Sequence, residues 1–325
     1  MAVRDVVTTR PMSPDRILVI KLGAFGDIIM AEGVFRDLRA HHPGAEITVL
    51  TRPGFAKLLR RCPSFDRVTA EPRDTRWRPD RTLAHWIMLR RSGFGRVYDL
   101  QNNRRTAVLR RLVLPGPAWS TLPLLPPDQR APETKPSMMV RFAGQMEAAG
   151  VPVRHTPDPN PDWMVDDAGD ALAAAGVAGA YVVLVPGSSA GLPHKRWPHY
   201  AALARALVDR GVPVVTVPGP DEIDLCRALP GRALLEADGR PLDWFRLAGV
   251  LKGAALVVGN DTGPTHLGVH LGRPTVALFG SHVSPQRTGL TRPWVSVLRK
   301  PAIADIAPAE ALAAVDARLG TAGRA

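Results

Sequence analysis

The sequence predicts an α/β protein of two doubly wound domains, each with a parallel sheet covered by helices on both faces. Short apolar runs typical of buried strands alternate with helical patterns in both halves of the chain. The length of 325 residues suits two domains. Proline clusters separate the halves, so we place a linker near residues 150–163 and domains over 1–155 and 156–325.

In the first half, apolar runs and helical spacing alternate four times. Strands are expected at 17–20, 47–50, 67–69 and 97–100, and helices at 28–40, 56–61, 83–91 and 106–112. The proline-rich stretch that follows is expected to continue neither a sheet nor a helix, apart from one amphipathic helix over 137–149.

The second half repeats this architecture. Strands are expected at 181–185, 214–217, 256–258 and 275–279, and helices at 200–209, 221–229, 242–252, 264–271 and 308–319. The last of these helices is expected to pack back on the first domain. Ligands of open α/β sheets bind beyond the carboxyl ends of the strands, so two such domains leave a cleft that presents two substrates to each other.

Composition narrows the class of protein. Hydrophobic residues make up 45% and charged residues 22%, which excludes a disordered or fibrous chain. No apolar window reaches the ~18 residues of a transmembrane helix, and residues 1–16 lack the apolar core of a signal peptide. Cys62 and Cys226 stand alone, which predicts buried thiols in a reducing compartment rather than a disulfide framework or a zinc site. We expect a cytoplasmic protein.

The charge is uneven along the chain. The net charge is +12, with 26 basic and 15 acidic side chains in residues 1–160 but 16 and 15 in the remainder. A basic half beside a neutral half indicates an anionic partner, which this count alone leaves open between nucleic acid, a membrane surface and an acidic substrate.

Three loops each follow an expected strand and open an expected helix. The first, 23–27, has two glycines that allow a ligand close to the backbone, and it ends in Asp27. The second, 186–198, combines small and hydroxyl residues with Lys195 and Arg196 ahead of a helix, a set that suits a diphosphate. The alternatives are a helix cap for Asp27 and a solvated basic loop for the second segment.

The third loop, 258–266, brings Asp261 to a helix start, and Gly263 allows close approach. His266 lies one helical turn beyond Thr262 and is able to face the same ligand, although a lone histidine is more often structural. No H-E-x-x-H or D-x-D motif is present, so no metal site is expected.

Taken together, these loops resemble the ADP-heptose:lipopolysaccharide heptosyltransferases, glycosyltransferase family nine. The resemblance rests on four motifs in order: KLGAFGD after the first strand, YDLQ at 98–101, KRWP at 195–198, and GNDTGPTH at 259–266 followed by PTVALFG. It extends roughly from residue 16 to residue 289. It implies a GT-B fold of two facing Rossmann-like domains, the nucleotide sugar held mainly by the C-terminal one.

The resemblance also implies roles for individual residues. Asp27 matches the general base that takes the proton of the acceptor hydroxyl. Lys195 matches the group that offsets charge on the departing ADP. The donor-binding positions are Ser188, Ser189, Lys195, Glu222, Asp261, Thr262, Gly263 and His266. The implied reaction inverts the anomeric centre and uses neither metal nor cofactor, ADP-heptose being a substrate.

With the donor assigned to the neutral half, the basic half becomes the acceptor side. Candidate acceptor-binding residues are Gly26, Arg60, Arg61, Arg104 and Arg105. Their expected partner is an anionic lipid-linked glycan, with peripheral contact to the cytoplasmic face of the inner membrane and no nucleic acid.

The segments after Asp27 and after Gly280 depart from the family pattern. Another nucleotide sugar therefore stays open as donor. A basic nucleic-acid-binding protein and a catalytically inactive donor-binding protein are the alternatives from other classes.

Overall fold

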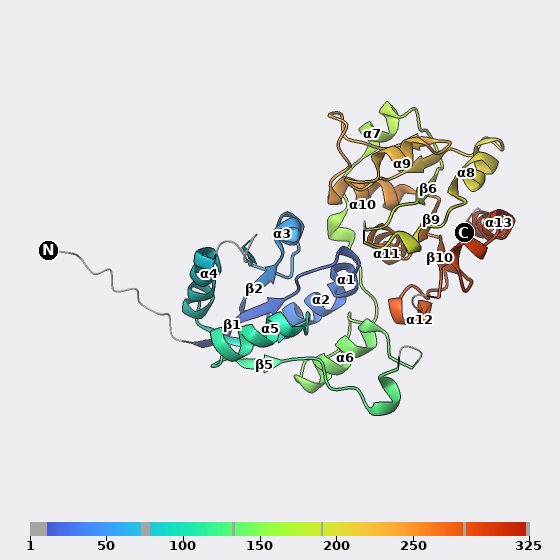
Figure 1. The fold of residues 1–325 in the computed structure, drawn as a ribbon. Helices are drawn as coiled ribbons and strands as arrows, with labels where there is room; N and C mark the ends of the chain where they lie inside the picture. The colour runs from blue at the N-terminus through green and yellow to red at the C-terminus, as the bar shows by residue number, and fades with distance from the viewer. Residues whose placement is uncertain (1–11, 73–78, 132–133, 190, 282–283, 323–325) are drawn as a thin grey trace. The chain divides into compact units, whose positions relative to one another are not determined.

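The structure is a computed structural model that describes residues 12–72, 79–131, 134–189, 191–281 and 284–322. The chain divides into two compact units. Unit 1 comprises Met1–Leu124 and Met139–Pro159, and unit 2 comprises Leu125–Met138 and Asn160–Ala325. In Figure 1, the strands of unit 1 run from blue to green and those of unit 2 from yellow-green to red.

Unit 1 holds a parallel five-stranded sheet in the order β3-β2-β1-β4-β5. The strands are β1 (Ser13–Ile20), β2 (Glu46–Thr51), β3 (Arg67–Ala70), β4 (Phe94–Asp99) and β5 (Ala118–Ser120). The helical segments are α1 (Phe25–Met30), α2 (Glu32–His41), α3 (Pro53–Leu59), α4 (Pro79–Arg91), α5 (Arg104–Val108), the π-helical η1 (Leu109–Val113) and α6 (Met138–Ala148). All four strands expected in this half are present.

The proline-rich stretch differs from expectation at one point. Residues 118–120 form β5, which pairs with β4 through Val97 and Trp119, so the prediction that this stretch leaves the sheet is wrong there. The strand contains no proline itself and lies at the sheet edge, where few ladder hydrogen bonds are needed.

Unit 2 holds a parallel six-stranded sheet in the order β11-β10-β9-β6-β7-β8. The strands are β6 (Val182–Val185), β7 (Val214–Thr216), β8 (Arg232–Ala233), β9 (Leu256–Asn260), β10 (Thr275–Phe279) and β11 (Val295–Arg299). The α-helices are α7 (Gly169–Ala174), α8 (Tyr200–Val208), α9 (Ile223–Arg227), α10 (Trp244–Gly253), α11 (Gly263–His270), α12 (Pro285–Thr288) and α13 (Pro308–Ala322).

The structure also has four short 3-10 turns: η2 (Pro127–Gln129), η3 (Asp162–Met164), η4 (Pro193–Lys195) and η5 (Ile303–Asp305). The last helix, α13, buries Ala311 and Val315 in the same apolar cluster as β6, β9 and α8, so its core contacts lie within unit 2. No helix among the described residues is long and apolar enough to cross a bilayer.

Both strand orders follow the nucleotide-binding Rossmann pattern, in which the chain reverses direction across the sheet beside its first strand. In unit 1 the reversal falls between β1 and β4, and in unit 2 between β6 and β9. Ligands bind at this switch point, beyond the carboxyl ends of the two strands. All three loops singled out from the sequence follow one of these four strands.

Candidate functional site

A chain of contacting polar side chains joins two loops of unit 2 at the switch point. Lys195, at the end of η4, places its Nζ 2.6 Å from Oδ2 of Asp261, which directly follows β9. The other carboxylate oxygen, Oδ1, lies 3.2 Å from Nε2 of His266 in α11. Asp261 is 8% exposed, and a charge buried this far needs such partners. Three predicted donor-binding residues are therefore in direct contact.

Lys195 retains a donor for a ligand. Its ammonium group has three N–H bonds, of which one donates to Asp261 Oδ2 and another to the Asp261 carbonyl at 3.2 Å. The side chain is 17% exposed, and neither of these contacts uses the third N–H. The contact with Asp261 thus fixes the orientation of Lys195 and leaves one N–H with which the lysine can bind a phosphate.

The buried side chain of Asn260 holds the two loops together. Its amide donates to the carbonyls of Pro186 at 3.0 Å and Gly187 at 3.2 Å. Its Oδ1 accepts from the backbone N–H of Trp197 and from the Tyr200 hydroxyl. All four of its hydrogen-bonding positions are thereby used within the protein. Asn260 was not among the predicted site residues, although it stands within the GNDTG motif.

The Ser188 hydroxyl also forms hydrogen bonds within its own loop. Its hydroxyl donates to the Leu192 carbonyl at 2.9 Å and accepts from Nε of Arg196 at 3.1 Å. It is buried, whereas the neighbouring Ser189 is exposed. Of the two predicted diphosphate-binding serines, Ser189 is therefore the one whose side chain is open to solvent.

Glu222, which follows β7, lies against the loop that follows β6. It is the residue before α9, and its Oε2 accepts from the N–H of Gly219 at 2.8 Å. A Cβ at Gly187 would stand 2.0 Å from the Glu222 carboxyl carbon, so glycine at this position lets the Glu222 side chain lie directly against the loop. The loops after β6 and β7 meet here.

Thr262 and Gly263 form the start of α11. Thr262 is the N-cap residue, in extended conformation, and Gly263 is the first residue of the eight-residue helix. Pro264, the second residue, has no N–H, so the first turn of α11 offers the N–H groups of Gly263 and Thr265 at the carboxyl edge of the sheet, where a helix start favours an anion.

In unit 1, Asp27 lies in α1, just beyond β1. Its carboxylate is 44% exposed. Oδ2 accepts from the N–H of Ala24 at 3.2 Å and lies 3.7 Å from Nζ of Lys21, while Oδ1 has no hydrogen-bond partner among the described residues. The helix-capping interpretation thus holds for one oxygen, and the other oxygen is free to accept a proton.

Lys21 is the buried neighbour of this carboxylate. Its side chain is 2% exposed, and Nζ also lies 5.7 Å from the Phe142 ring centroid. Burial lowers the pKa of Lys21, and the nearby carboxylates of Asp27 and Asp99 oppose that shift. Lys21 lies within the KLGAFGD motif, although the sequence predicts no role for it.

The YDLQ segment shapes the same edge of the sheet. The Asp99 carboxylate accepts from the N–H groups of Gln101 and Asn102. The Gln101 side chain accepts from the N–H of Leu22 at 2.9 Å. The loops after β1 and β4 are thereby fixed to each other, as those after β6 and β9 are in unit 2.

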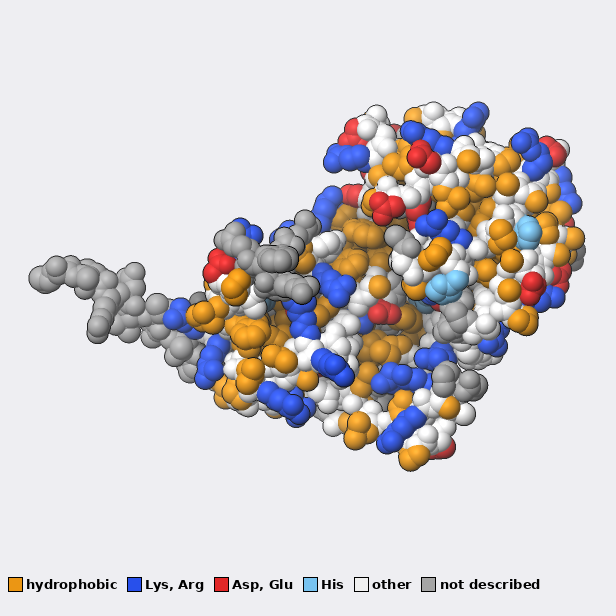
Figure 2. Space-filling view, in the orientation of Figure 1, with side chains coloured by type: hydrophobic (Ala, Val, Ile, Leu, Met, Phe, Trp, Pro, Cys, Tyr) orange, Lys and Arg blue, Asp and Glu red, His pale blue; other side chains and the backbone are white. Residues whose placement is uncertain are grey.

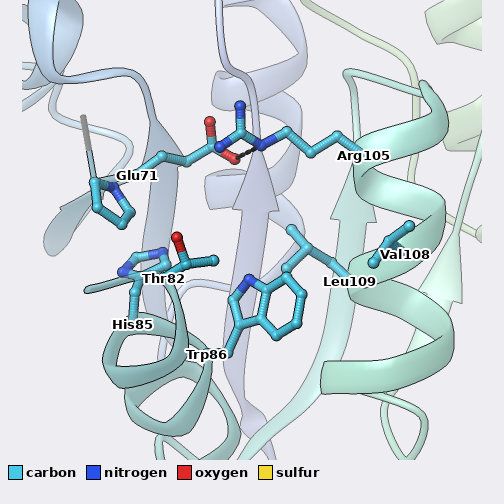
Figure 3. Close-up of a pocket in the computed structure, with 8 residues that line it drawn as sticks. Glu71, Thr82, His85, Trp86, Arg105, Val108 and Leu109 are labelled. Carbon is cyan, nitrogen blue, oxygen red and sulfur yellow. Dashed lines mark ion pairs between the residues drawn. The ribbon is translucent and has the colours of Figure 1, made fainter. Parts of the chain in front are cut away.

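The predicted acceptor-binding arginines are placed in different surroundings. Arg105 donates from Nε to Oε1 of the buried Glu71 at 2.8 Å, and both line a pocket of about 200 Å³ (Figure 3). In Figure 3 this ion pair spans the top of the pocket, with Trp86 below it. Two polar atoms in its wall, Thr82 Oγ1 and His85 Nε2, are buried without a hydrogen-bond partner in the part of the chain that the structure describes.

The other candidates lie outside this pocket. Gly26 lies in α1 beside Asp27, and Arg104 is exposed at the start of α5. Arg60 and Arg61 are exposed just beyond the end of α3. Because α3 begins directly after β2, its far end points away from the carboxyl edge that carries Asp27.

No group of three or more His, Cys, Asp or Glu side chains is placed to hold a metal ion in the part of the chain that the structure describes. Both cysteines are buried free thiols, as expected, and burial raises the pKa of Cys62 to about 12 and that of Cys226 to about 11. Both thiols therefore stay protonated at neutral pH.

Comparison with known proteins identifies the family of this chain. The family model described as glycosyltransferase family 9 (heptosyltransferase) matches residues 82–304. Lipopolysaccharide heptosyltransferase 2 of Salmonella typhimurium is 26% identical over 82% of this chain and 82% of its own length.

Solved structures share the fold. The ADP-heptose lipopolysaccharide heptosyltransferase II of E. coli superimposes with a TM-score of 0.72 at 23% identity, covering 95% of this chain and all of its own. A family 9 glycosyltransferase from Veillonella parvula gives 0.76 at 18% identity, covering 96% and 99%. The GT-B fold is confirmed by this likeness. Because the family model spans more than half of the residues, the chain belongs to glycosyltransferase family 9, the heptosyltransferases.

Proposed function

We propose that the protein is an inverting glycosyltransferase that moves a heptose from ADP-heptose to an inner-core sugar of lipopolysaccharide, without a metal or other cofactor. The observation that carries this proposal is the contact of Lys195, Asp261 and His266 at the switch point of unit 2. The names of the Salmonella and E. coli relatives support the sugar, the donor and the lipopolysaccharide acceptor.

The residues divide the reaction between them. The acceptor hydroxyl oxygen attacks the anomeric carbon of the heptose while the bond from that carbon to the ADP oxygen breaks. The hydroxyl proton passes to Oδ1 of Asp27, the oxygen without a hydrogen-bond partner among the described residues. The free N–H of Lys195 and the first N–H groups of α11 stabilise the charge left on ADP.

The acceptor is proposed to be an anionic lipid-linked glycan at the cytoplasmic face of the inner membrane. The 26 basic side chains of residues 1–160 support an anionic partner on this side. The Arg105 pocket supports a glycan, because an aromatic ring beside unpaired hydroxyl and imidazole groups suits sugar hydroxyls. Nucleic acid is not among the expected partners.

The test of the base is the substitution Asp27→Asn, which keeps the shape of the side chain but removes its basicity. Transfer is expected to slow by about 10²–10⁴-fold, the usual contribution of a general base, while ADP affinity stays within about twofold of wild type. Rates are measured with truncated lipopolysaccharide acceptors that carry either no heptose or a single heptose, and ADP affinity by calorimetry. Turnover near the wild-type rate would remove Asp27 from the mechanism.

The same assay tests metal independence. Excess chelator is expected to leave the wild-type rate unchanged. Loss of activity that a divalent ion restores would show that a metal, rather than Lys195 and the helix amides, neutralises the departing diphosphate.

A further inference from the structure

Exposed apolar side chains gather on two neighbouring helical segments of unit 1. Half of the large apolar side chains that are exposed among the described residues lie there: Leu83, Ile87 and Met88 on α4, Val108 at the end of α5 and Leu112 on η1. Leu83 is 58% exposed and Leu112 65%. Single exposed apolar residues are ordinary, but a cluster on adjacent elements marks an interaction surface.

The two segments form one continuous surface, because α4 and η1 pack against each other. Leu89 of α4 shares a buried cluster with Leu109 and Val113 of η1. The side chains that point the other way are the exposed ones. Figure 2 shows apolar and basic side chains interleaved over the region where Figure 1 draws α4 and α5. We call residues 79–91 and 104–113 together the α4–η1 face.

This face is strongly basic. Six exposed arginines lie on it without an ion pair to any described residue: Arg81, Arg90, Arg91, Arg104, Arg110 and Arg111. Asp80 is its only acidic residue. Arginines elsewhere, such as Arg39, Arg210 and Arg246, are paired with carboxylates. The unpaired arginines therefore keep their full capacity to bind external anions.

The combination of exposed apolar side chains and unpaired arginines on the α4–η1 face favours one kind of binding partner. A second copy of the same face would bring like charges together at short distance, which is unfavourable. Single-stranded nucleic acid needs exposed aromatic rings for base stacking, whereas the exposed apolar side chains here are aliphatic. Aliphatic side chains surrounded by arginines suit the boundary between acyl chains and anionic headgroups.

We propose that the α4–η1 face binds the surface of an anionic lipid bilayer, with Leu83 and Leu112 inserted at the headgroup boundary and the arginines on lipid phosphates. The Arg105 pocket lies between the same helices, lined by Trp86 of α4 and by Val108 and Leu109. A face docked in this way brings that pocket to the bilayer, where a lipid-linked sugar is presented. This last step rests on the proposed function, while lipid binding itself does not.

The test is sedimentation of the full chain with vesicles. Vesicles of phosphatidylcholine with 30 mol% phosphatidylglycerol are the probe, where ~30 mol% sets an anionic surface comparable to a cytoplasmic leaflet. Vesicles of phosphatidylcholine alone are the reference. Binding is expected to the first, to be weak to the second, and to fall when salt is raised from ~0.1 to ~0.5 M.

Two variants separate the apolar and basic contributions. Arg110→Ser with Arg111→Ser is expected to lower the partition coefficient by about 30-fold, and Leu83→Ser with Leu112→Ser by at least about tenfold. The matched control is Arg205→Ser with Val208→Ser, an exposed basic and apolar pair on α8 of unit 2. It is expected to bind vesicles like wild type.

The readouts distinguish failure of the surface from failure of the proposed activity. Transfer to a water-soluble, delipidated acceptor is expected to be unchanged in all these variants, since none of the substituted residues lines the pocket or carries the chemistry. Equal sedimentation of wild type and both surface variants would overturn the docking proposal, as would binding that ignores lipid charge. Vesicle binding without any heptose transfer would overturn only the proposed function.

Discussion

His270 shows how the interior of unit 2 depends on the protonation state of one side chain. It lies in α11, four residues after His266, with both ring nitrogens buried and without a hydrogen bond to any described residue. Burial, together with the nearby His266 and Arg292, lowers the pKa of His270 to about 3. The imidazole is therefore neutral in the folded protein at any pH near neutrality.

This pKa makes the free energy of unfolding depend on pH. Below the unfolded pKa of ~6.5, the unfolded chain binds a proton that the folded chain does not, so the stability falls as pH falls from 6.5 toward 3. Between pH 7 and pH 4.5 this one residue is expected to account for a loss of about 2.5 kcal/mol. Urea unfolding of His270→Leu is expected to lack that part of the loss. An unchanged pH dependence in the variant would contradict a neutral His270.

At the scale of elements, the sequence predicts the strands that are buried in the core and misses strands that exist only because they pair at a sheet edge. β1, β6, β9 and β10 are apolar runs buried in their sheets, and all four were predicted. β11 and β8 were missed, because edge strands are only partly buried and carry no continuous apolar run. The expected helix over 106–112 is real but divides into α5 and a π-helical turn, a hydrogen-bond shift that periodicity does not reveal.

The candidate site follows the same division. The positions of Asp27, Lys195, Asp261 and His266 were predictable, since glycine-containing loops that join a strand to a helix mark the carboxyl edge of the sheet. The contacts between these side chains were not predictable from the sequence. Asn260 and Gln101 lie in recognisable motifs, but only the fold shows that each one ties two loops together.

Asn260 makes the link between the β6 and β9 loops testable. Asn260→Ala removes four hydrogen bonds and leaves the Trp197 N–H and two carbonyls buried without partners. We expect a loss of about 2–4 kcal/mol in the free energy of unfolding, together with weaker ADP binding as the loops separate. Chemical denaturation and calorimetry measure the two effects.

The matched control is Asn103→Ala in unit 1. Asn103 caps α5 by accepting from the N–H of Thr106 at 3.1 Å, so its loss is expected to cost ~1 kcal/mol without changing ADP affinity. If Asn260→Ala bound ADP as tightly as wild type, the two loops would not form a joint nucleotide site.

At the scale of the whole molecule, the two units differ in charge and in the chemistry of their switch points. The carboxyl edge of unit 2 carries a lysine and a helix N-terminus, which favour a diphosphate. That of unit 1 carries a half-exposed carboxylate on a basic unit, which favours a hydroxyl on an anionic molecule. Under the proposed function, unit 2 binds the donor and unit 1 the acceptor, although both units are built on the same strand order.

Nucleotide binding should therefore stabilise the protein through unit 2 alone. ADP at 100 times its dissociation constant adds about 2.7 kcal/mol of stability, which for a unit of this size raises the unfolding temperature by about 5–10 °C. Asp27→Asn is expected to keep this shift. Lys195→Ala, compared with its own nucleotide-free form, is expected to retain under ~1 kcal/mol of it, because a charge-assisted contact with the diphosphate is lost. Scanning calorimetry with ADP, UDP and GDP makes the measurement: a full shift in Lys195→Ala would place the diphosphate elsewhere, and a shift with UDP or GDP alone would replace ADP-heptose as the donor.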